Sequence, residues 1–222
     1  MGLIYYTGDG TPKDLNRAFI WFNMAAEQGD PEGEYYAAYM YVHALGTNAN
    51  LEEAVRFYTD SAEKGFVHSM FNLAHMYSDG LGVSQDWVKA IDLYTRAMER
   101  GSVPACYRLG VIYEEGRGTE PDQEKAFECY TRCVDAGYVR AFCRLALMYL
   151  RGRGTDTDSK MAVMLLSRAA SEGDSDAMLW LGKLSLSGEG MVKSIGNARR
   201  WLRKAAVRGN AEAKELIDTL EP

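Results

Sequence analysis

The amino-acid sequence repeats with a period of 36 residues. Alanine returns once in every period: Ala18, Ala54, Ala90, Ala126, Ala162 and Ala198. Glycine does the same at Gly29, Gly65, Gly101, Gly137, Gly173 and Gly209. A Gly-x-Gly pair recurs with the same period, from Gly8 and Gly10 to Gly188 and Gly190, and Ala44 replaces the first glycine in one repeat. A fixed period of about 20–50 residues is the signature of stacked structural repeats, so a solenoid is predicted.

Between the glycines, apolar residues recur three and four positions apart, which is the pattern of helices with one buried face. We predict a first helix of each repeat, helix A, over 33–44, 69–80, 105–116, 141–152 and 177–188. A second helix, helix B, is predicted over 14–28, 50–64, 86–100, 122–136, 158–172 and 194–208. Capping or turn residues such as Ser84, Thr155 and Asp158 precede helix B, and Pro12 and Pro121 are acceptable near its first turn.

No single helix pair can bury its own apolar face, so stacking on neighbouring pairs must supply the core. We therefore expect one domain over 1–222. Its parts are a partial repeat over 1–32, repeats over 33–68, 69–104, 105–140, 141–176 and 177–210, and a capping helix over 211–222.

The two ends of the chain differ from the interior repeats. The first ten residues match only the second half of a helix A, so a truncated N-terminus is expected. The apolar edge there comprises Leu3, Ile4, Tyr5 and Tyr6. An upstream helix would cover this edge, or the edge would support self-association. At the other end, Asp218 and Glu221 give the polar outer face of a natural terminal cap.

The composition argues against several classes of protein. Of the 222 residues, 47% are hydrophobic and 25% charged, so a folded chain is expected. A net charge of −6 provides no basic stripe for phosphate contacts, so a protein with a basic residue fits better than nucleic acid. The sequence has no run of about 18 apolar residues, so no membrane-spanning helix is predicted. All four cysteines lie between 106 and 143, which favours a reducing compartment without identifying it.

One stretch carries a family resemblance. The segment LGVIYEEGRG over 109–118, then Asp122 to Ala126 and the Cys129–Tyr130 pair, resembles the Sel-one-like repeat family, a relative of the tetratricopeptide repeats. The resemblance covers essentially the whole chain. It implies an all-α, right-handed alpha-alpha superhelix (solenoid) of about six 36-residue helix-turn-helix repeats. The chain departs from the cysteine-rich members of the family, because five of its six repeats lack the cysteine pairs.

The same resemblance implies a binding surface. In tetratricopeptide-type solenoids helix A lines the concave face, so its variable positions are the candidates for a partner-binding groove. These are Tyr35, Tyr39, His43, Phe71, His75, Asp79, Glu114, Glu115 and Arg151. We expect the aromatic and histidine residues to hold an apolar partner segment, and the three acidic residues to meet a Lys or Arg on it. Two alternatives stay open. Tyr35, Phe71 and Tyr107 could instead pack between adjacent helices A, and the acidic residues could form a solvated face.

Little in the sequence indicates catalysis. The Gly-x-Gly pairs follow helices and lack a continuation to Gly-Lys-Ser/Thr, so they are predicted to be turns and not phosphate loops. His43, His68 and His75 are too few for a histidine-rich metal site. Cys129 and Cys133, one helical turn apart, leave open a metal site, a redox pair or a disulfide, but both occupy core positions, where cysteine acts as a small hydrophobe. We expect no enzymatic activity, metal or cofactor.

The function favoured by the sequence is a protein–protein interaction scaffold or adaptor that binds a partner segment on the concave helix-A surface. The alternative is a soluble regulator or inhibitor of the immunity type that docks onto an enzyme. A large preformed interface would support the second function, and capture of a short peptide the first.

Overall fold

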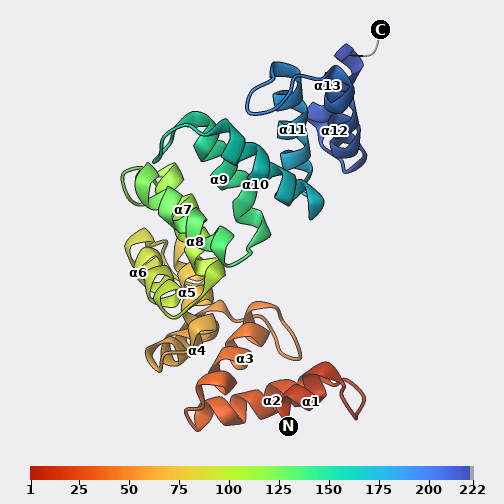
Figure 1. Ribbon diagram of the computed structural model, residues 1–222. Helices are drawn as coiled ribbons and strands as arrows, with labels where there is room; N and C mark the ends of the chain where they lie inside the picture. Colours follow the sequence, from red (N-terminus) through yellow and green to blue (C-terminus); the bar gives the residue numbers. More distant parts are fainter. Residues whose placement is uncertain (221–222) are drawn as a thin grey trace. The chain divides into compact units, whose positions relative to one another are not determined.

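The computed structural model describes residues 1–220, and within that range every regular element is an α-helix (Figure 1). The odd-numbered helices are the A helices: α1 (Gly2–Thr7), α3 (Pro31–Val42), α5 (Val67–Asp79), α7 (Val103–Glu115), α9 (Val139–Arg151), α11 (Ser175–Ser187) and α13 (Ala211–Leu220). The even-numbered helices are the B helices: α2 (Leu15–Glu27), α4 (Leu51–Glu63), α6 (Trp87–Glu99), α8 (Gln123–Asp135), α10 (Ser159–Ser171) and α12 (Ile195–Val207). The predicted all-α repeat of helix pairs is confirmed. Of the predicted capping helix, Glu221 and Pro222 lie outside the described residues.

Contacts divide the chain into two compact units. The N-terminal unit comprises residues 1–109 and 117–119, and the C-terminal unit comprises 110–116 and residues from 120 onward. Within the N-terminal unit each helix from α1 to α6 packs against the next, and the same holds from α8 to α13 in the C-terminal unit. Each unit is described by itself below, and the single array expected from the sequence stays a prediction.

A recurring side-chain cap fixes the start of helix B. The N-cap residues are Asp14, Asn50, Asp86, Asp122, Asp158 and Ser194, again 36 positions apart. Each accepts a hydrogen bond of 2.9–3.2 Å from the backbone N–H three residues on, which satisfies an otherwise unpaired donor of the first turn. Of the predicted capping or turn residues, Asp158 is the cap, and Ser84 and Thr155 lie before the cap in the connecting loop.

Helix A begins about two residues earlier than predicted, because its N-terminus also has its own signals. In α3, Asp30 is the N-cap and accepts from the Gly33 N–H at 2.7 Å, and Pro31 takes the first helical position. Asp174 caps α11 in the same way. The predicted ranges for helix B are right to within one residue at either end.

The second glycine of each Gly-x-Gly pair lets the loop after helix A approach the preceding helix B. A Cβ on Gly82, whose φ is +70°, would lie 2.6 Å from the carbonyl oxygen of Leu51, the first residue of α4. No side chain fits at that distance. The predicted turns are confirmed, and the contact recurs with the period of 36, since Gly46, Gly154 and Gly190 approach the first residues of the preceding B helices in the same way.

The core lies along the small residues of helix B. The six period-defining alanines, from Ala18 to Ala198, are fully buried. Large side chains pack around them: Tyr58, Tyr94, Tyr130, Leu166 and Leu202 are almost completely buried. Cys129 and Cys133 are buried in this layer too, so the prediction that both occupy core positions is confirmed. The exception is the first repeat, where Trp21 is 40% exposed while its repeat equivalent Phe57 is 4% exposed.

Candidate functional site

Aromatic residues form a row along α3 in the N-terminal unit. The ring centroids of Tyr35 and Tyr39 are 6.4 Å apart, and those of Tyr39 and His43 are 4.3 Å apart. A spacing of four residues places these side chains on one face of the helix. Tyr35 and Tyr39 are half-buried and His43 is exposed at the C-terminal end of α3. Three predicted residues are therefore brought together.

Tyr35 also packs against the start of α5. Its ring lies 5.2 Å from Phe66, 5.8 Å from His68 and 6.0 Å from Tyr58, measured between centroids. Burial raises the pKa of the Tyr35 hydroxyl. One repeat later, Phe71 packs edge-to-face on Tyr94 at 5.6 Å. Tyr35 thus contacts the start of the next helix A, as the alternative of packing between A helices expects, whereas Phe71 contacts Tyr94 of the B helix α6, and both Tyr35 and Phe71 also line an open cleft.

This cleft, which we call the α5–α7 cleft, has a volume of about 630 Å³. It is lined by Tyr35, Val67, His68, Phe71, Asn72, Arg100, Gly101, Ser102, Val103 and Pro104, all in the N-terminal unit. Its walls are mainly apolar and aromatic, with a few polar groups, which is the usual character of a binding site.

The predicted residues at the other end of α5 form a polar pair. The Nδ1 atom of His75 lies 3.2 Å from a carboxylate oxygen of Asp79, and the His75 side chain is partly buried while that of Asp79 is exposed. The Ser78 hydroxyl donates to Asp79 at 3.0 Å. Asp79 remains an accessible acidic group at the C-terminal end of this helix.

Glu114, Glu115 and Arg151 belong to the C-terminal unit. Glu114 accepts hydrogen bonds from the Tyr130 hydroxyl at 2.8 Å and from Arg144 at 3.1 Å, and its side chain is only 15% exposed. The charge of Glu114 is thus offset by Arg144, whereas a Lys or Arg of the partner was expected to pair with it. Glu115 and Arg151 are exposed, and the Arg151 guanidinium lies 5.6 Å from the Trp180 ring centroid.

Sequence reasoning missed the residues of the cleft that lie outside the helix-A positions it compared. The polar side chains among them are His68, Asn72, Arg100 and Ser102, and the others are Val67, Gly101, Val103 and Pro104. A signal was present in the turn before helix A. Ser102 stands where two other repeats carry the rings of Phe66 and Tyr138. Comparing this turn position across the repeats would have indicated a gap.

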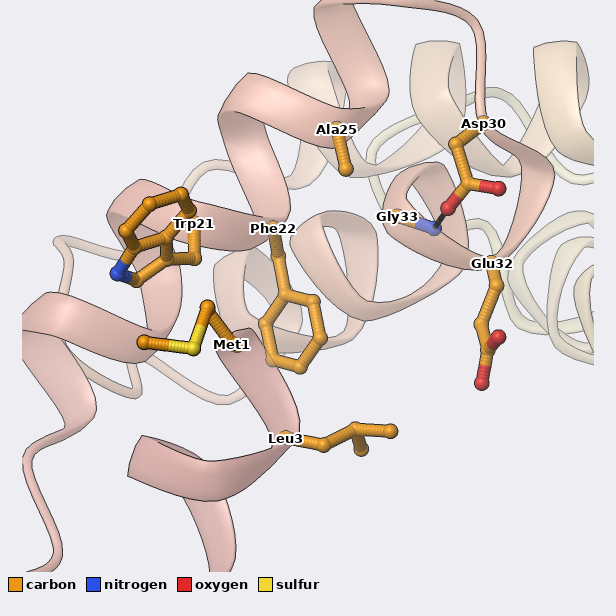
Figure 2. A pocket seen from close by; sticks show the side chains of 9 residues that line it. Met1, Leu3, Trp21, Phe22, Ala25, Asp30, Glu32 and Gly33 are labelled. Carbon is orange, nitrogen blue, oxygen red and sulfur yellow. Dashed lines mark hydrogen bonds between the residues drawn. The ribbon is translucent and has the colours of Figure 1, made fainter. Parts of the chain in front are cut away.

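A smaller opening of about 290 Å³ lies at the N-terminal edge (Figure 2). Met1, Leu3, Trp21, Phe22 and Ala25 contribute to its lining, and the acidic Asp30 and Glu32 lie at the start of α3. Of the predicted apolar edge, Leu3 and Ile4 are exposed. Tyr5 and Tyr6 are half-buried, and the Tyr6 ring packs against Phe22 and Tyr36. Self-association through this edge stays a prediction.

The cysteines are buried, and burial raises the pKa of the Cys143 thiol to about 12. Within residues 1–220, no group of three or more His, Cys, Asp or Glu side chains is arranged to hold a metal ion. None of the helices in that range combines the length and the apolarity needed to cross a membrane.

Comparisons with known proteins agree with the repeat pattern. The family model for the Sel1 repeat matches residues 1–30, 31–66, 67–102, 103–138, 140–174 and 175–210. No curated protein matches the chain.

Among solved structures, a protective antigen of uropathogenic Escherichia coli strains that displays an SLR fold is 31% identical, with a TM-score of 0.94 over 99% of this chain. The chain spans about half of that protein, 47% of its length. A Sel1 repeat protein from Oxalobacter formigenes is 29% identical, with a TM-score of 0.87, and the match covers 97% of this chain and 84% of that one. An immunity protein from Pseudomonas aeruginosa shares the fold at 18% identity and a TM-score of 0.52, over 99% of this chain and 81% of its own. With six matched repeats and these structural likenesses, the chain belongs to the Sel1 repeat family.

Proposed function

We propose that the chain is a protein–protein interaction scaffold that binds a segment of its partner on the helix-A surface of the N-terminal unit. Sel1 repeat proteins generally mediate protein–protein interactions, and scaffolds of this family are typically not enzymes. The observation that carries the proposal is the joining of the aromatic row of α3 to the α5–α7 cleft through Tyr35, which belongs to both.

The chemistry of this surface suits a peptide segment. Half-buried aromatic rings offer apolar area at little entropic cost, and such residues dominate the energetics of interfaces. Tyr35, Tyr39 and Phe71 are held in place by ring contacts within the unit, so little ordering accompanies binding. We propose that Asp79, which is exposed, meets a Lys or Arg of the partner. Glu115 and Arg151 are proposed as further contacts made by the C-terminal unit.

The alternative function, an immunity-type regulator, has less support. The immunity protein from Pseudomonas aeruginosa is only 18% identical to this chain, so that likeness concerns the fold alone. The adaptor is therefore the function that we propose.

The test compares affinity captures from cells of the source organism. The bait is the wild-type chain or a Tyr39→Ala/His75→Ala variant, and a Val88→Ala/Met164→Ala variant of the exposed helix-B face is the control. We expect a partner that wild type and control retain and the helix-A variant loses, with unchanged circular dichroism for all three. A partner retained by the helix-A variant and lost by the control would move the binding surface to the B helices and refute the proposal.

A further inference from the structure

We propose that the α5–α7 cleft accepts an apolar side chain of the partner together with an adjacent Asp or Glu, whose carboxylate pairs with Arg100. This inference rests on the proposed function and specifies the chemistry of the bound segment.

The apolar half of the cleft lies where the preceding repeat holds a ring. In that repeat the Phe66 ring fills the turn before helix A and packs 5.2 Å from Tyr35 and 5.5 Å from His68. At the equivalent position the chain has Ser102, whose hydroxyl accepts a hydrogen bond from the Ala105 N–H at 3.4 Å, and this small side chain leaves the space between α5 and the first turn of α7 open. The hollow is thus shaped by neighbours that elsewhere in the chain accommodate a ring, and an aromatic or large aliphatic side chain of the partner matches it.

The charge at the cleft follows from a second comparison between repeats. Lys64 is the repeat equivalent of Arg100, and it forms an ion pair with Glu34, whose side chain is 4% exposed. The residue equivalent to Glu34 is Met70, which is completely buried and carries no charge. Arg100 therefore occupies the position of a paired cation without the acid that pairs it. Among the described residues no carboxylate forms an ion pair with Arg100, and no acidic side chain lines the cleft.

The N-terminus of α5 has the same electrostatic sense. Phe66, the N-cap residue of α5, provides no side-chain cap, so the partial positive charge of the helix N-terminus beside the cleft is not offset by a side chain. A lysine or arginine of the partner would be repelled here. A carboxylate would take the place that Glu34 takes beside Lys64. Because the chain has a net charge of −6, an acidic segment is attracted by this local arrangement and not by the molecule as a whole.

The first experiment selects binders from a phage-displayed library of random eight-residue peptides with the full chain. We expect enriched peptides in which Asp or Glu adjoins Phe, Tyr, Leu or Met. One enriched peptide and its twin, with the acid replaced by the amide, are then labelled with fluorescein and titrated by fluorescence anisotropy. The acidic peptide is expected to bind about tenfold more tightly than its twin.

Charge reversal tests the role of Arg100. In Arg100→Glu the preference for the acidic peptide should disappear, and a third peptide with Lys in place of the acid should bind better to this variant than to wild type. Arg208→Glu is the matched control, because Arg208 is exposed, occupies the same repeat position and changes the net charge equally. That variant should keep the preference unchanged.

Filling the hollow tests the apolar half. Ser102→Phe introduces the residue that the chain already uses at Phe66, where α5 has no side-chain cap, and it removes the hydrogen bond that the Ser102 hydroxyl accepts from the Ala105 N–H. We expect this variant to lose binding of both the acidic peptide and its amide twin. If it does not fold, Ser102→Leu and the charge reversal at Arg100 supply the same test.

The outcomes separate this inference from the proposed function. The inference would be overturned if the selected peptides were not enriched in Asp or Glu, or if the preference for the acidic peptide survived Arg100→Glu. The proposed function would still stand if Tyr39→Ala/His75→Ala abolished binding of the selected peptides. If wild type selects no peptide at all, the inference and peptide recognition by this surface both fail.

Discussion

The close contact at the second glycine of a Gly-x-Gly pair leads to a quantitative prediction. Gly82→Ala places a methyl group 2.6 Å from the Leu51 carbonyl oxygen and 2.7 Å from the carbonyl carbon, in a backbone conformation with φ +70°. Gly65→Ala is the matched control in the same unit, since its φ is +91° and a Cβ there would meet nothing within 4 Å. The pair separates the cost of the left-handed conformation from the cost of the clash.

The expected magnitudes follow from these two terms. Alanine in the left-handed region costs about 1–2 kcal/mol relative to glycine, and the lower entropy of the unfolded chain offsets about 0.4–1 kcal/mol of this. Gly65→Ala should therefore lower the free energy of unfolding by about 1 kcal/mol. Gly82→Ala should cost about 1–3 kcal/mol more, because the loop must move away from the first turn of α4.

Urea unfolding followed by far-ultraviolet circular dichroism measures the difference. With an m-value of about 2 kcal/mol per molar urea, Gly82→Ala should unfold at a urea concentration about 0.5–1.5 M below that of Gly65→Ala. Equal midpoints for the two variants would show that the loop does not depend on the absence of a Cβ. The explanation of the second glycine would then be wrong.

Three further predictions concern stability and reactivity. Asp86→Ala should lower the free energy of unfolding by about 1 kcal/mol through loss of the α6 cap, while Ser84→Ala should leave it unchanged in the same urea assay; equal effects would contradict the cap assignment. Glu34→Met should leave the free energy of unfolding nearly unchanged, because methionine occupies this position in the next repeat. Lys64→Ala should lower it by about 2 kcal/mol, because a buried carboxylate is left without its cation. A larger loss for Glu34→Met than for Lys64→Ala would refute the comparison. Cys143 should resist iodoacetamide at pH 8 until the protein unfolds, since burial raises its thiol pKa to about 12. As the pH rises from about 9 toward 12, the Cys143 thiol loses its proton in the unfolded chain before it does so in the folded protein, so the free energy of unfolding should fall. A urea midpoint that does not change over this pH range would argue against the raised pKa of Cys143.

The fold was predictable because it depends on what the repeats share. The constant spacing of Ala18 and its equivalents, and of the paired glycines, determined the number of helices, their order and the buried face. The first residue of helix A was harder to predict from the sequence, since the N-terminus of this helix follows Asp30 and Pro31 in one repeat and Phe66 in the next. Among the helix-B caps only Asp158 was predicted, although the caps recur every 36 residues, because nearby serine and threonine residues such as Ser84 have the same capping chemistry.

The candidate site was only partly predictable because it depends on how the repeats differ. Ser102 and Arg100 become informative when compared with Phe66 and Lys64, and only the structure shows what those two residues contact. Glu114 was expected to face a partner, but it pairs with Arg144, 30 residues later. The Glu34–Lys64 pair has the same separation. The first pair links successive repeats and the second links the two helices of one repeat, and neither follows from the period alone.

The contact between the second glycine of one loop and the first turn of the preceding helix B has a consequence for how such a chain can change its length. The contact joins residues 31 positions apart at Gly46 and Leu15, at Gly82 and Leu51, and at Gly154 and Gln123. Removing or duplicating any 36 consecutive residues inside the array would regenerate the same contact across the new junction. A gene of this kind could therefore gain or lose whole periods by unequal recombination at arbitrary breakpoints, whereas an insertion of another length between the two contacting residues would change their separation of 31 positions.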